Sequence, residues 1–349
     1  MSDPTVVFTA RLMPPAALGG LERFSADVLE ALRAEFEVRD LANYGGKASQ
    51  WRYLATIRHA AKKAVRGVAT PVVDASDASL AFAAAASGAP SVLRVHGLDL
   101  LFPNPAYQFL LRKHLPRVSR VVANSGPTSQ LLNRLRIPEE RLSIVHPAAE
   151  APPGWTPAPV PGRILMVGRL VARKGVVPFI EDIWPRLCRD LPQSRLDVAG
   201  DGSEREAVDK AVASAPEKGR ITLHGRASQP LLESLYREAD VLVLNNQPSK
   251  VDFEGFGIVA AEAASRGIPV VANRLDGVVD AVLPGRTGIL VEAGDPAAMA
   301  DAVAAIVRRQ ALGNRTAIQE AAGQRWSKAR LRSQYAAIVR EVAESHAPA

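Results

Sequence analysis

Short apolar runs, each closed by turn residues, recur along this 349-residue chain and alternate with stretches of helical character. In the second half of the chain these runs are residues 164–167, 196–199, 221–223 and 241–244. The first half repeats the arrangement with residues 6–9, 92–95 and 121–123. Strands that alternate with helices form βα units, in which helices cover a parallel sheet. The sequence therefore predicts an α/β fold built on parallel sheets.

The length of the chain indicates two domains, because 349 residues exceed the ~100–200 typical of one. A hydrophobic content of 47% is sufficient for two cores. Residues 147–161 are rich in proline and cannot sustain a helix or a central strand, so they mark the boundary. We predict Rossmann-like domains over residues 1–150 and 162–325, joined by a linker at 151–161. A last helix is expected within residues 325–344, where apolar residues recur at helical spacing: Trp326, Leu331, Tyr335, Ile338 and Val342.

Two glutamates, Glu254 and Glu262, flank a glycine-containing turn that leads into a helix expected from about Phe256. Gly255 and Gly257 let the backbone approach a ligand, and a helix N-terminus presents N–H groups and a positive dipole end to an anion. The helical rise between the carboxylates, ~12 Å, is too long for both to act on one bond. The spacing favours a two-ended ligand such as a nucleotide sugar. Alternatively, Glu254 is an exposed carboxylate at the helix start and Glu262 a satisfied core group.

Basic and turn residues follow two of the predicted strands. Arg169 and Lys174 come after residues 164–167, and an α/β sheet presents such side chains at the carboxyl ends of its strands. The turn that contains Gly200 and Asp201 follows the next strand. Taken alone, the cations would form a solvated loop, Asp201 would be a turn residue, and His224 would be packed in the fold.

These segments resemble the retaining glycosyltransferases of the GT-B fold, in particular glycosyltransferase family four (glycosyl transferases group one). The family pattern E-G-F-G-x-x-x-x-E-A, followed by G-x-P-V-V-A, is matched by residues 254–263 and 267–272. The resemblance covers nearly the whole chain. It implies two Rossmann-like parallel-sheet domains that face each other across a cleft, and a C-terminal helix, residues 326–349, that crosses back to the N-terminal domain. The chain departs from the family pattern at residues 146–150 and 276–280.

The resemblance also implies roles for individual residues. Arg169 and Lys174 would bind the diphosphate of the donor and neutralise the leaving group, while Glu254 would orient the sugar. His96, in an N-terminal domain that binds the acceptor, would lie beside the transferred sugar, although a lone histidine at a strand end is otherwise structural. The expected catalytic residues are therefore His96, Arg169, Lys174 and Glu254. The expected donor-binding residues are Gly19, Gly20, Gly200, Asp201, Gly202, Gly255, Phe256, Gly257, Ile258 and Glu262, the last of which would hold the ribose.

The activity that the resemblance implies is transfer of a hexosyl-type sugar from a nucleotide-diphosphate sugar to a hydroxyl acceptor, with retention at the anomeric carbon. No cofactor and no metal are expected, because the chain has no Asp-x-Asp and basic side chains must carry the leaving-group charge. The nucleotide (UDP, GDP or ADP) and the acceptor (saccharide, lipid-linked or small metabolite) stay open. The alternatives are a nucleotide-sugar epimerase, a phosphorylase, and a protein that binds nucleotide sugars without transfer.

The formal net charge of +7 is concentrated partly in residues 41–73, which contain no acidic residue. A helix from about Ser49 would carry an apolar stripe that begins at Trp51 and continues through Ile57 and Ala61. The basic residues 47–66 would then lie on an anionic membrane or receive an anionic acceptor. In the other interpretation the stripe packs on the domain's own sheet. Nucleic acid is not expected as a partner, because few aromatic residues lie near these charges and no binding motif is present.

A single cysteine, Cys188, excludes an intrachain disulfide and is consistent with a reducing compartment. The first residues do not form a signal peptide, and no apolar run approaches the ~20 residues that span a bilayer. We therefore expect a cytoplasmic protein, with peripheral attachment to the inner face of the membrane as an option that depends on residues 47–66.

Overall fold

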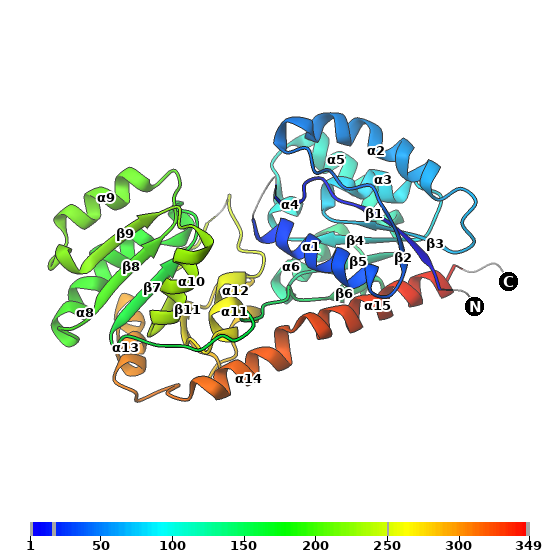
Figure 1. Ribbon diagram of the computed structural model, residues 1–349. Helices are drawn as coiled ribbons and strands as arrows, with labels where there is room; N and C mark the ends of the chain where they lie inside the picture. Colours follow the sequence, from blue (N-terminus) through cyan, green and yellow to red (C-terminus); the bar gives the residue numbers. More distant parts are fainter. Residues whose placement is uncertain (1–2, 16–18, 250, 347–349) are drawn as a thin grey trace. The chain divides into compact units, whose positions relative to one another are not determined.

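The computed structural model describes residues 3–15, 19–249 and 251–346, and the chain divides into two compact units (Figure 1). The N-terminal unit comprises residues 1–148 and 328–349, and the C-terminal unit comprises residues 149–327. Among the described residues, each unit contains one parallel sheet of six strands. This confirms the predicted α/β fold with two Rossmann-like parallel sheets.

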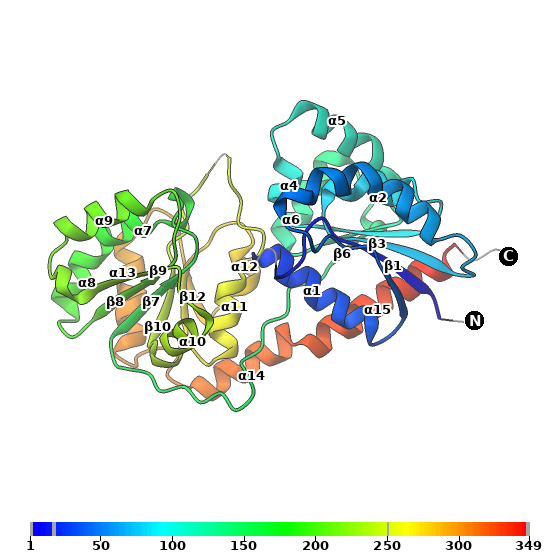
Figure 2. The same ribbon diagram turned by 45° about the horizontal axis from the view of Figure 1, so that its top comes forward.

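The N-terminal sheet has the strand order β2-β1-β3-β4-β5-β6. Its strands, in chain order, are β1 (Thr5–Thr9), β2 (Glu37–Asp40), β3 (Pro71–Ala75), β4 (Ser91–Val95), β5 (Arg120–Ala123) and β6 (Leu142–Ile144). Successive side chains of a strand point to opposite faces. Val6 accordingly packs under α1 (Gly20–Arg33) and α15 (Lys328–Glu344), which lie side by side in Figures 1 and 2. Val7 packs under α2 (Gln50–Ala64), α3 (Ala81–Ala85) and α5 (Pro105–His114) on the other face.

A buried polar cluster attaches the last helix to this sheet. The Arg94 Nη1 of β4 lies 2.9 Å from Asp74 Oδ1 of β3, and both side chains have 0% exposure. Arg94 Nη1 also donates to the hydroxyl of Tyr335 in α15 at 3.2 Å, and that hydroxyl donates to Asp74 Oδ2. A buried ion pair needs such extra hydrogen bonds to offset its desolvation. The cluster therefore specifies where α15 sits on the sheet.

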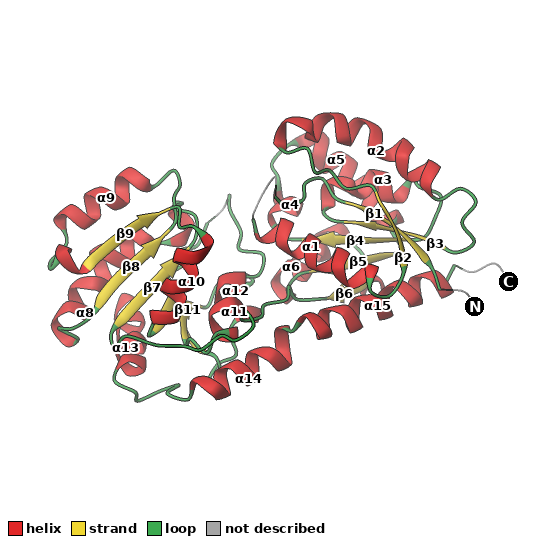
Figure 3. Ribbon diagram, viewed as in Figure 1, coloured by secondary structure: helices red, strands yellow, loops and turns green. Residues whose placement is uncertain are grey.

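The C-terminal sheet has the order β12-β11-β10-β7-β8-β9, and helices cover both of its faces (Figure 3). Its strands are β7 (Arg163–Val167), β8 (Arg195–Ala199), β9 (Ile221–Gly225), β10 (Val241–Leu244), β11 (Val270–Asn273) and β12 (Gly288–Val291). β7 and β10 are neighbours at the centre of the sheet. β8 and β9 follow on the side of β7, and β11 and β12 follow on the side of β10. The loops that follow β7 and β10 therefore diverge, and in open α/β sheets that point binds ligands.

The remaining helices connect these strands. In the N-terminal unit they are α4 (Leu98–Leu101) and α6 (Gly126–Leu131). In the C-terminal unit they are α7 (Val176–Pro178), α8 (Trp184–Asp190), α9 (Arg205–Ser214), α10 (Gln229–Glu238), α11 (Ile258–Ser265), α12 (Val278–Ala281), α13 (Pro296–Val307) and α14 (Arg315–Trp326). Residues 147–161 contain no helix or strand. No helix in the described part of the chain is both long and apolar enough to cross a membrane.

The structure differs from the sequence predictions at three places. The helix expected from about Phe256 begins at Ile258. The helix expected from residue 325 is interrupted at Ser327, so Trp326 ends α14 and packs in the core of the C-terminal unit. The stripe expected on α2 is wrong at Trp51, which is 82% exposed, whereas Ile57 and Ala61 are buried against the sheet. The buried part of the stripe therefore packs on the domain's own sheet, which is the second interpretation given for this helix.

Candidate functional site

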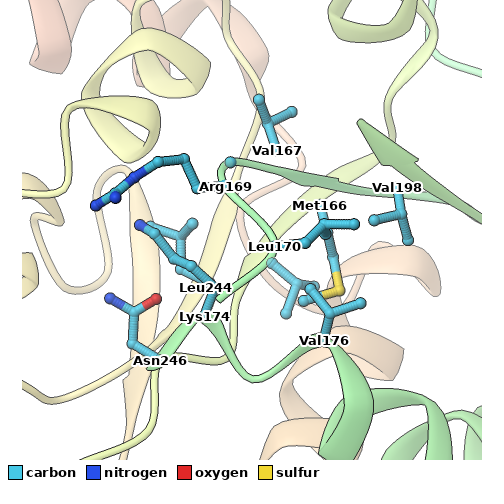
Figure 4. A pocket seen from close by; sticks show the side chains of 11 residues that line it. Met166, Val167, Arg169, Leu170, Lys174, Val176, Val198, Leu244 and Asn246 are labelled. Atoms are coloured by element: carbon cyan, nitrogen blue, oxygen red, sulfur yellow. The ribbon is translucent and has the colours of Figure 1, made fainter. Parts of the chain in front are cut away.

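A pocket lies at the carboxyl ends of β7 and β10 in the C-terminal unit. Met166 and Val243 contribute to its apolar wall, and its polar side chains are Arg169, Lys174 and Asn246. Figure 4 shows the polar ends of these three side chains on the same side of the pocket. Because β7 and β10 are the strands at which the strand order reverses, topology and surface shape indicate the same candidate site.

The loop after β7 is held in place by the turn after β8. A Cβ atom on Gly200 would lie 1.8 Å from the carbonyl oxygen of Gly168, and one on Gly202 would lie 2.2 Å from that of Leu170. Only glycine permits so close an approach. The Asp201 side chain accepts a hydrogen bond from the Gly202 N–H at 2.9 Å, as a turn residue does. Gly200, Asp201 and Gly202 thus support the pocket wall, and contact with a donor stays a prediction for them.

Arg169 projects from this loop and is exposed. Within residues 3–15, 19–249 and 251–346 its guanidinium has no ion-pair or hydrogen-bond partner. A guanidinium presents its donors in a planar fork that matches carboxylate and phosphate oxygens. Arg169 is therefore available to an anionic ligand in this pocket.

Lys174, the second predicted cation, donates a hydrogen bond to the Oε2 of Glu254. The same oxygen accepts from Arg173 Nη1 at 2.6 Å and from Asn246 Nδ2 at 3.1 Å. Burial alone would raise the pKa of Glu254, but the charges of Lys174 and Arg173 outweigh burial and lower the pKa to about 2. Glu254 is therefore an ionised hydrogen-bond acceptor at neutral pH and not a proton donor.

Arg173 and Asn246 are members of this cluster that the sequence interpretation missed. The Arg173 side chain is 4% exposed, and its Nε lies 3.0 Å from Asp252 Oδ2. The only signal in the sequence was the pair of basic residues at 173 and 174 and the two acidic residues at 252 and 254. Asn246 follows β10 and is held by the Asn273 Nδ2, which donates to its backbone oxygen at 2.9 Å. No comparable signal marked Asn246. Its contact with Glu254 spans eight residues, whereas that of Arg173 with Glu254 joins segments 81 residues apart.

The turn before α11 depends on a segment in which the chain departs from the family pattern. The Glu254 N–H donates to Asp276 Oδ2 at 3.1 Å, and the Gly277 N–H donates to the Glu254 carbonyl at 2.8 Å. A Cβ atom on Gly277 would lie 2.0 Å from the carbonyl oxygen of Gly255. Gly257, the N-cap of α11, has a φ of 81°, a conformation that favours glycine. The structure thus places Gly255 and Gly257 where their backbone sets the direction of the helix.

The other predicted residues of α11 lie in two environments. The Phe256 side chain is 4% exposed and contacts Trp326 in the core, with ring centroids 6.4 Å apart. Its side chain is therefore enclosed in the core. Ile258 is the first residue of the helix and packs partly on the same core. Glu262 lies farther along the helix, where its Oε2 accepts from the hydroxyl of Tyr236 at 3.2 Å.

The N-terminal unit carries the remaining predicted residues, His96, Gly19 and Gly20. His96 follows β4, and its Nε2 lies 2.7 Å from the carbonyl oxygen of Ser76, so this nitrogen carries a proton and donates. Its ring contacts the edge of Phe24 of α1, with centroids 5.8 Å apart. Gly19 is the N-cap of α1 and Gly20 is its first residue. The roles of all three residues in ligand binding stay predictions.

His224 is packed and does not line the pocket. Its Nε2 lies 2.6 Å from Asp197 Oδ1, and Asp197 Oδ2 also accepts from Arg163 Nε at 2.6 Å. These contacts join β7, β8 and β9 and match the structural interpretation of this histidine.

Sequence comparison relates both halves of the chain to one group of proteins. Residues 161–309 match the family described as "Glycosyl transferases group 1", and residues 18–150 match the one described as "Glycosyltransferase Family 4". The chain is 31% identical to a D-inositol 3-phosphate glycosyltransferase of Pseudarthrobacter chlorophenolicus over 247 residues, which are 64% of this chain and 57% of that protein. It is 36% identical to a glycogen synthase of Mycobacterium tuberculosis over 162 residues, 45% of this chain and 36% of the relative. The chain thus spans about a third to just over half of these relatives.

Solved structures share the fold over almost the whole chain. Anabaena HepE in complex with UDP-glucose superposes with a TM-score of 0.73 at 17% identity, over 97% of this chain and 99% of that one. Sucrose-phosphate synthase from Thermosynechococcus elongatus superposes with a TM-score of 0.71 at 18% identity, over 99% and 100% of the two chains. At this level of identity the likeness shows a common fold.

Proposed function

Because the chain belongs to the group 1 glycosyltransferases of family 4, we propose that it transfers a sugar from a nucleotide-diphosphate donor to a hydroxyl acceptor. The observation that carries this proposal is the pair of cations in the pocket between β7 and β10. Arg169 is exposed and has no side-chain partner among the residues that the structure describes, and Lys174 enters the same pocket from the same loop. A diphosphate supplies the oxyanions that such a pair can bind.

In the proposed reaction the bond between the anomeric carbon and the diphosphate oxygen breaks as a bond to the acceptor oxygen forms. Negative charge then develops on the diphosphate, where Arg169 and Lys174 stabilise it. The acceptor proton passes to an oxygen of the departing phosphate, so no protein base is needed. An attack from the face that the diphosphate leaves retains the anomeric configuration.

Glu254 would hold a sugar hydroxyl as a hydrogen-bond acceptor, which fits its lowered pKa. When the diphosphate attracts Lys174, the Glu254 carboxylate still has Arg173 and Asn246 as donors. The carboxylate therefore keeps its position while Lys174 changes partner, which favours a preorganised site. In the same proposal Glu262 binds the ribose hydroxyls and the start of α11 faces the diphosphate.

The finer parts of the proposal concern the donor. UDP-glucose is the first donor to test, since Anabaena HepE, which shares the fold, has been solved with UDP and with UDP-glucose. We propose a hexosyl group and a reaction without metal, in which the cations of the pocket neutralise the leaving group. A cytoplasmic location is proposed as well. A membrane contact is a separate proposal, because it depends on side chains of the N-terminal unit.

The experiment that tests this function is titration calorimetry of the protein with UDP, GDP and ADP, with and without added magnesium. One nucleotide should bind without metal, and Arg169→Ala should weaken it about 10- to 100-fold, the equivalent of ~1.5–3 kcal/mol for a hydrogen bond to a charged group. Arg195→Ala is the matched control, because Arg195 is exposed at the opposite, amino end of β8. Equal affinity of the Arg169→Ala variant would contradict the proposed pocket.

Turnover then separates transfer from its alternatives. The bound donor is incubated alone, with phosphate, and with a panel of saccharide, lipid-linked and small-molecule acceptors, and products are followed by NMR. A new glycosidic bond of unchanged anomeric configuration supports retaining transfer. Conversion of donor alone indicates an epimerase, phosphate-dependent release of a sugar phosphate indicates a phosphorylase, and binding without any product indicates a protein that only binds nucleotide sugars.

A further inference from the structure

Large apolar side chains are exposed on two neighbouring helical segments of the N-terminal unit. Trp51 of α2 is 82% exposed, and Phe109 and Leu110 of α5 are 65% and 46% exposed. Phe102, between α4 and α5, is 53% exposed. A single exposed apolar residue needs no explanation, but a group of large ones on one face indicates an interaction site.

The outer face of α5 is apolar where a helix of a water-soluble protein is ordinarily polar. Ala106, Phe109, Leu110 and Lys113 recur at the spacing of one helical face, and all four are exposed. Leu111 is the buried residue that attaches the helix to the core. The apolar residues of this face are therefore directed away from the unit to which the helix belongs.

These side chains are held firmly rather than exposed by a loose loop. The Gln108 Nε2 donates to the carbonyl oxygens of Leu100 and Phe102, both at 3.0 Å. The Tyr107 hydroxyl donates to the Asp99 carbonyl at 2.6 Å, and its ring meets the Phe102 ring edge-on with centroids 5.5 Å apart. The segment α4–α5 is thus a rigid platform for its exposed residues.

The same two segments of the chain also carry exposed cations. The cations are Lys47, Arg52, Arg58, Lys62, Lys63, Arg66, Arg112, Lys113 and Arg117. Within the described part of the chain none of them has an ion-pair partner. Between residues 41 and 138 the acidic residues are Asp74, Asp77 and Asp99. Each of these is engaged inside the fold, by Arg94, by the Ser79 N–H and by the His96 N–H respectively.

The two helices lie on the same face of the N-terminal sheet. Both α2 and α5 pack on α3, and Figures 1 and 2 show them next to each other. The pKa of His114 at the end of α5 is lowered by burial and by Arg117, Lys113 and Arg58, so a cation of α2 acts at α5. A surface that combines unpaired cations with an exposed tryptophan, phenylalanines and leucine matches an interface of anionic headgroups over acyl chains.

We propose that α2 and the α4–α5 segment, residues 47–66 and 98–117, dock the protein on an anionic lipid bilayer. Trp51, Phe102, Phe109 and Leu110 enter the headgroup region, and the cations contact lipid phosphates. Of the apolar stripe expected on α2 from the sequence, Ile57 and Ala61 are buried within the unit, whereas Trp51 is exposed and is one of the docking residues. This inference does not rest on the proposed transferase activity, because the surface can be tested without donor or acceptor.

The test is flotation of the full chain with vesicles of phosphatidylcholine alone or mixed with phosphatidylglycerol, without nucleotide. The protein should float with the mixed vesicles and not with the neutral ones, and high salt should weaken binding. Phe109→Ala combined with Trp51→Ala should lower the partition coefficient at least about 10-fold, since each large apolar side chain contributes several-fold when buried. Lys62→Gln with Lys63→Gln should lower it by a similar factor. Lys210→Gln with Lys218→Gln, exposed cations of the C-terminal unit, is the matched control.

Tryptophan fluorescence reports insertion directly. Trp184 and Trp326 are 0% and 1% exposed and Trp155 is half-buried, so Trp51 is the indole whose emission should shift to the blue on mixed vesicles. Trp51→Phe should remove that shift while the protein still floats. Equal binding to neutral vesicles, no flotation, or unchanged binding of the two double variants would overturn the proposal. Self-association of the chain in solution that is lost in the Trp51→Ala/Phe109→Ala variant would assign the surface to a second copy instead.

Discussion

The Nη1 of Arg173 lies 2.6 Å from the Oε2 of Glu254, and the Arg173 side chain is 4% exposed. This pair joins the loop after β7 to the turn before α11, the two segments that carry the predicted cations and the predicted sugar-binding carboxylate. Lys174 donates to the same carboxylate. The two cations nevertheless differ in role. Arg173 is enclosed and structural, whereas Lys174 lines the pocket and can change partner.

Arg173→Met should therefore destabilise the protein as well as impair the site. Because Glu254 keeps Lys174 and Asn246 as donors, the expected cost is that of a lost hydrogen bond to a charged group, about 1.5–3 kcal/mol, rather than that of an uncompensated buried charge. The measurement is urea unfolding, alongside the transfer rate or, before a substrate is known, the affinity for the nucleotide. Arg195→Met, at the exposed start of β8, should change neither by more than about 0.5 kcal/mol. A free energy of unfolding that is unchanged in Arg173→Met would show that the pair contributes nothing to the fold.

The contribution of Glu254 to stability should depend on pH. Its pKa is lowered from the ordinary value of 4.5 to about 2, so ionisation of this carboxylate favours the folded state. The contribution is fully present above pH ~5 and is lost as the pH falls from about 4.5 towards 2. The unfolding free energies of the protein and of Glu254→Gln should therefore differ by roughly 3 kcal/mol at pH 7, and by about 1 kcal/mol less at pH 4.

Chemical denaturation at pH 7, 6, 5 and 4 measures this difference, with both proteins compared at each pH so that other titrations cancel. Tyr236→Phe, which removes the hydroxyl that donates to Glu262, serves as a control without a charge change. A difference between the two proteins that stays constant down to pH 4, or that grows on acidification, would contradict the lowered pKa.

Most of the fold could be predicted from local patterns, because buried parallel strands are continuous apolar runs. The strands β2, β3, β6, β11 and β12 were not among those predicted. For β2 the reason is physical, since Glu37–Asp40 lies at the edge of the sheet, pairs with β1 and has side chains that are exposed or half-buried. Trp326 was assigned to the wrong helix, because helical spacing continues across the break at Ser327. The predicted pocket residues on the β7 loop were found from strand ends and motif spacing. Arg173 and Asn246 could not be found, because the contact of Arg173 with Glu254 joins segments 81 residues apart and Asn246 is held by Asn273, 27 residues along the chain.

The buried pair Arg94–Asp74 should stabilise the attachment of α15 to the N-terminal sheet. Arg94→Met leaves the Asp74 carboxylate without its cation, which should cost about 3–5 kcal/mol. Tyr335→Phe removes only the hydroxyl and should cost about 1–3 kcal/mol. Urea unfolding measures both, and hydrogen exchange should show faster exchange of the α15 amides in Arg94→Met. If the two variants lose the same free energy, the charge of Arg94 is not what holds the cluster.

Gly200→Ala should separate the turn after β8 from the loop that carries Arg169. The added Cβ would lie 1.8 Å from the Gly168 carbonyl oxygen, so one backbone segment must move. Overpacking of this kind costs about 1–3 kcal/mol. Because Gly168 precedes Arg169, the displacement should also weaken nucleotide binding, although the substitution removes no polar group from the pocket.

Gly219→Ala is the matched substitution, because a Cβ atom at Gly219 meets no other atom within 4 Å. Its unfolding free energy and nucleotide affinity should equal those of the unmodified protein within about 0.5 kcal/mol. Titration calorimetry and urea unfolding on both variants separate two explanations of the glycine turn. Loss of affinity together with stability in Gly200→Ala indicates that the turn positions the β7 loop, whereas loss of affinity at unchanged stability would mean that the ligand itself occupies the space above Gly200.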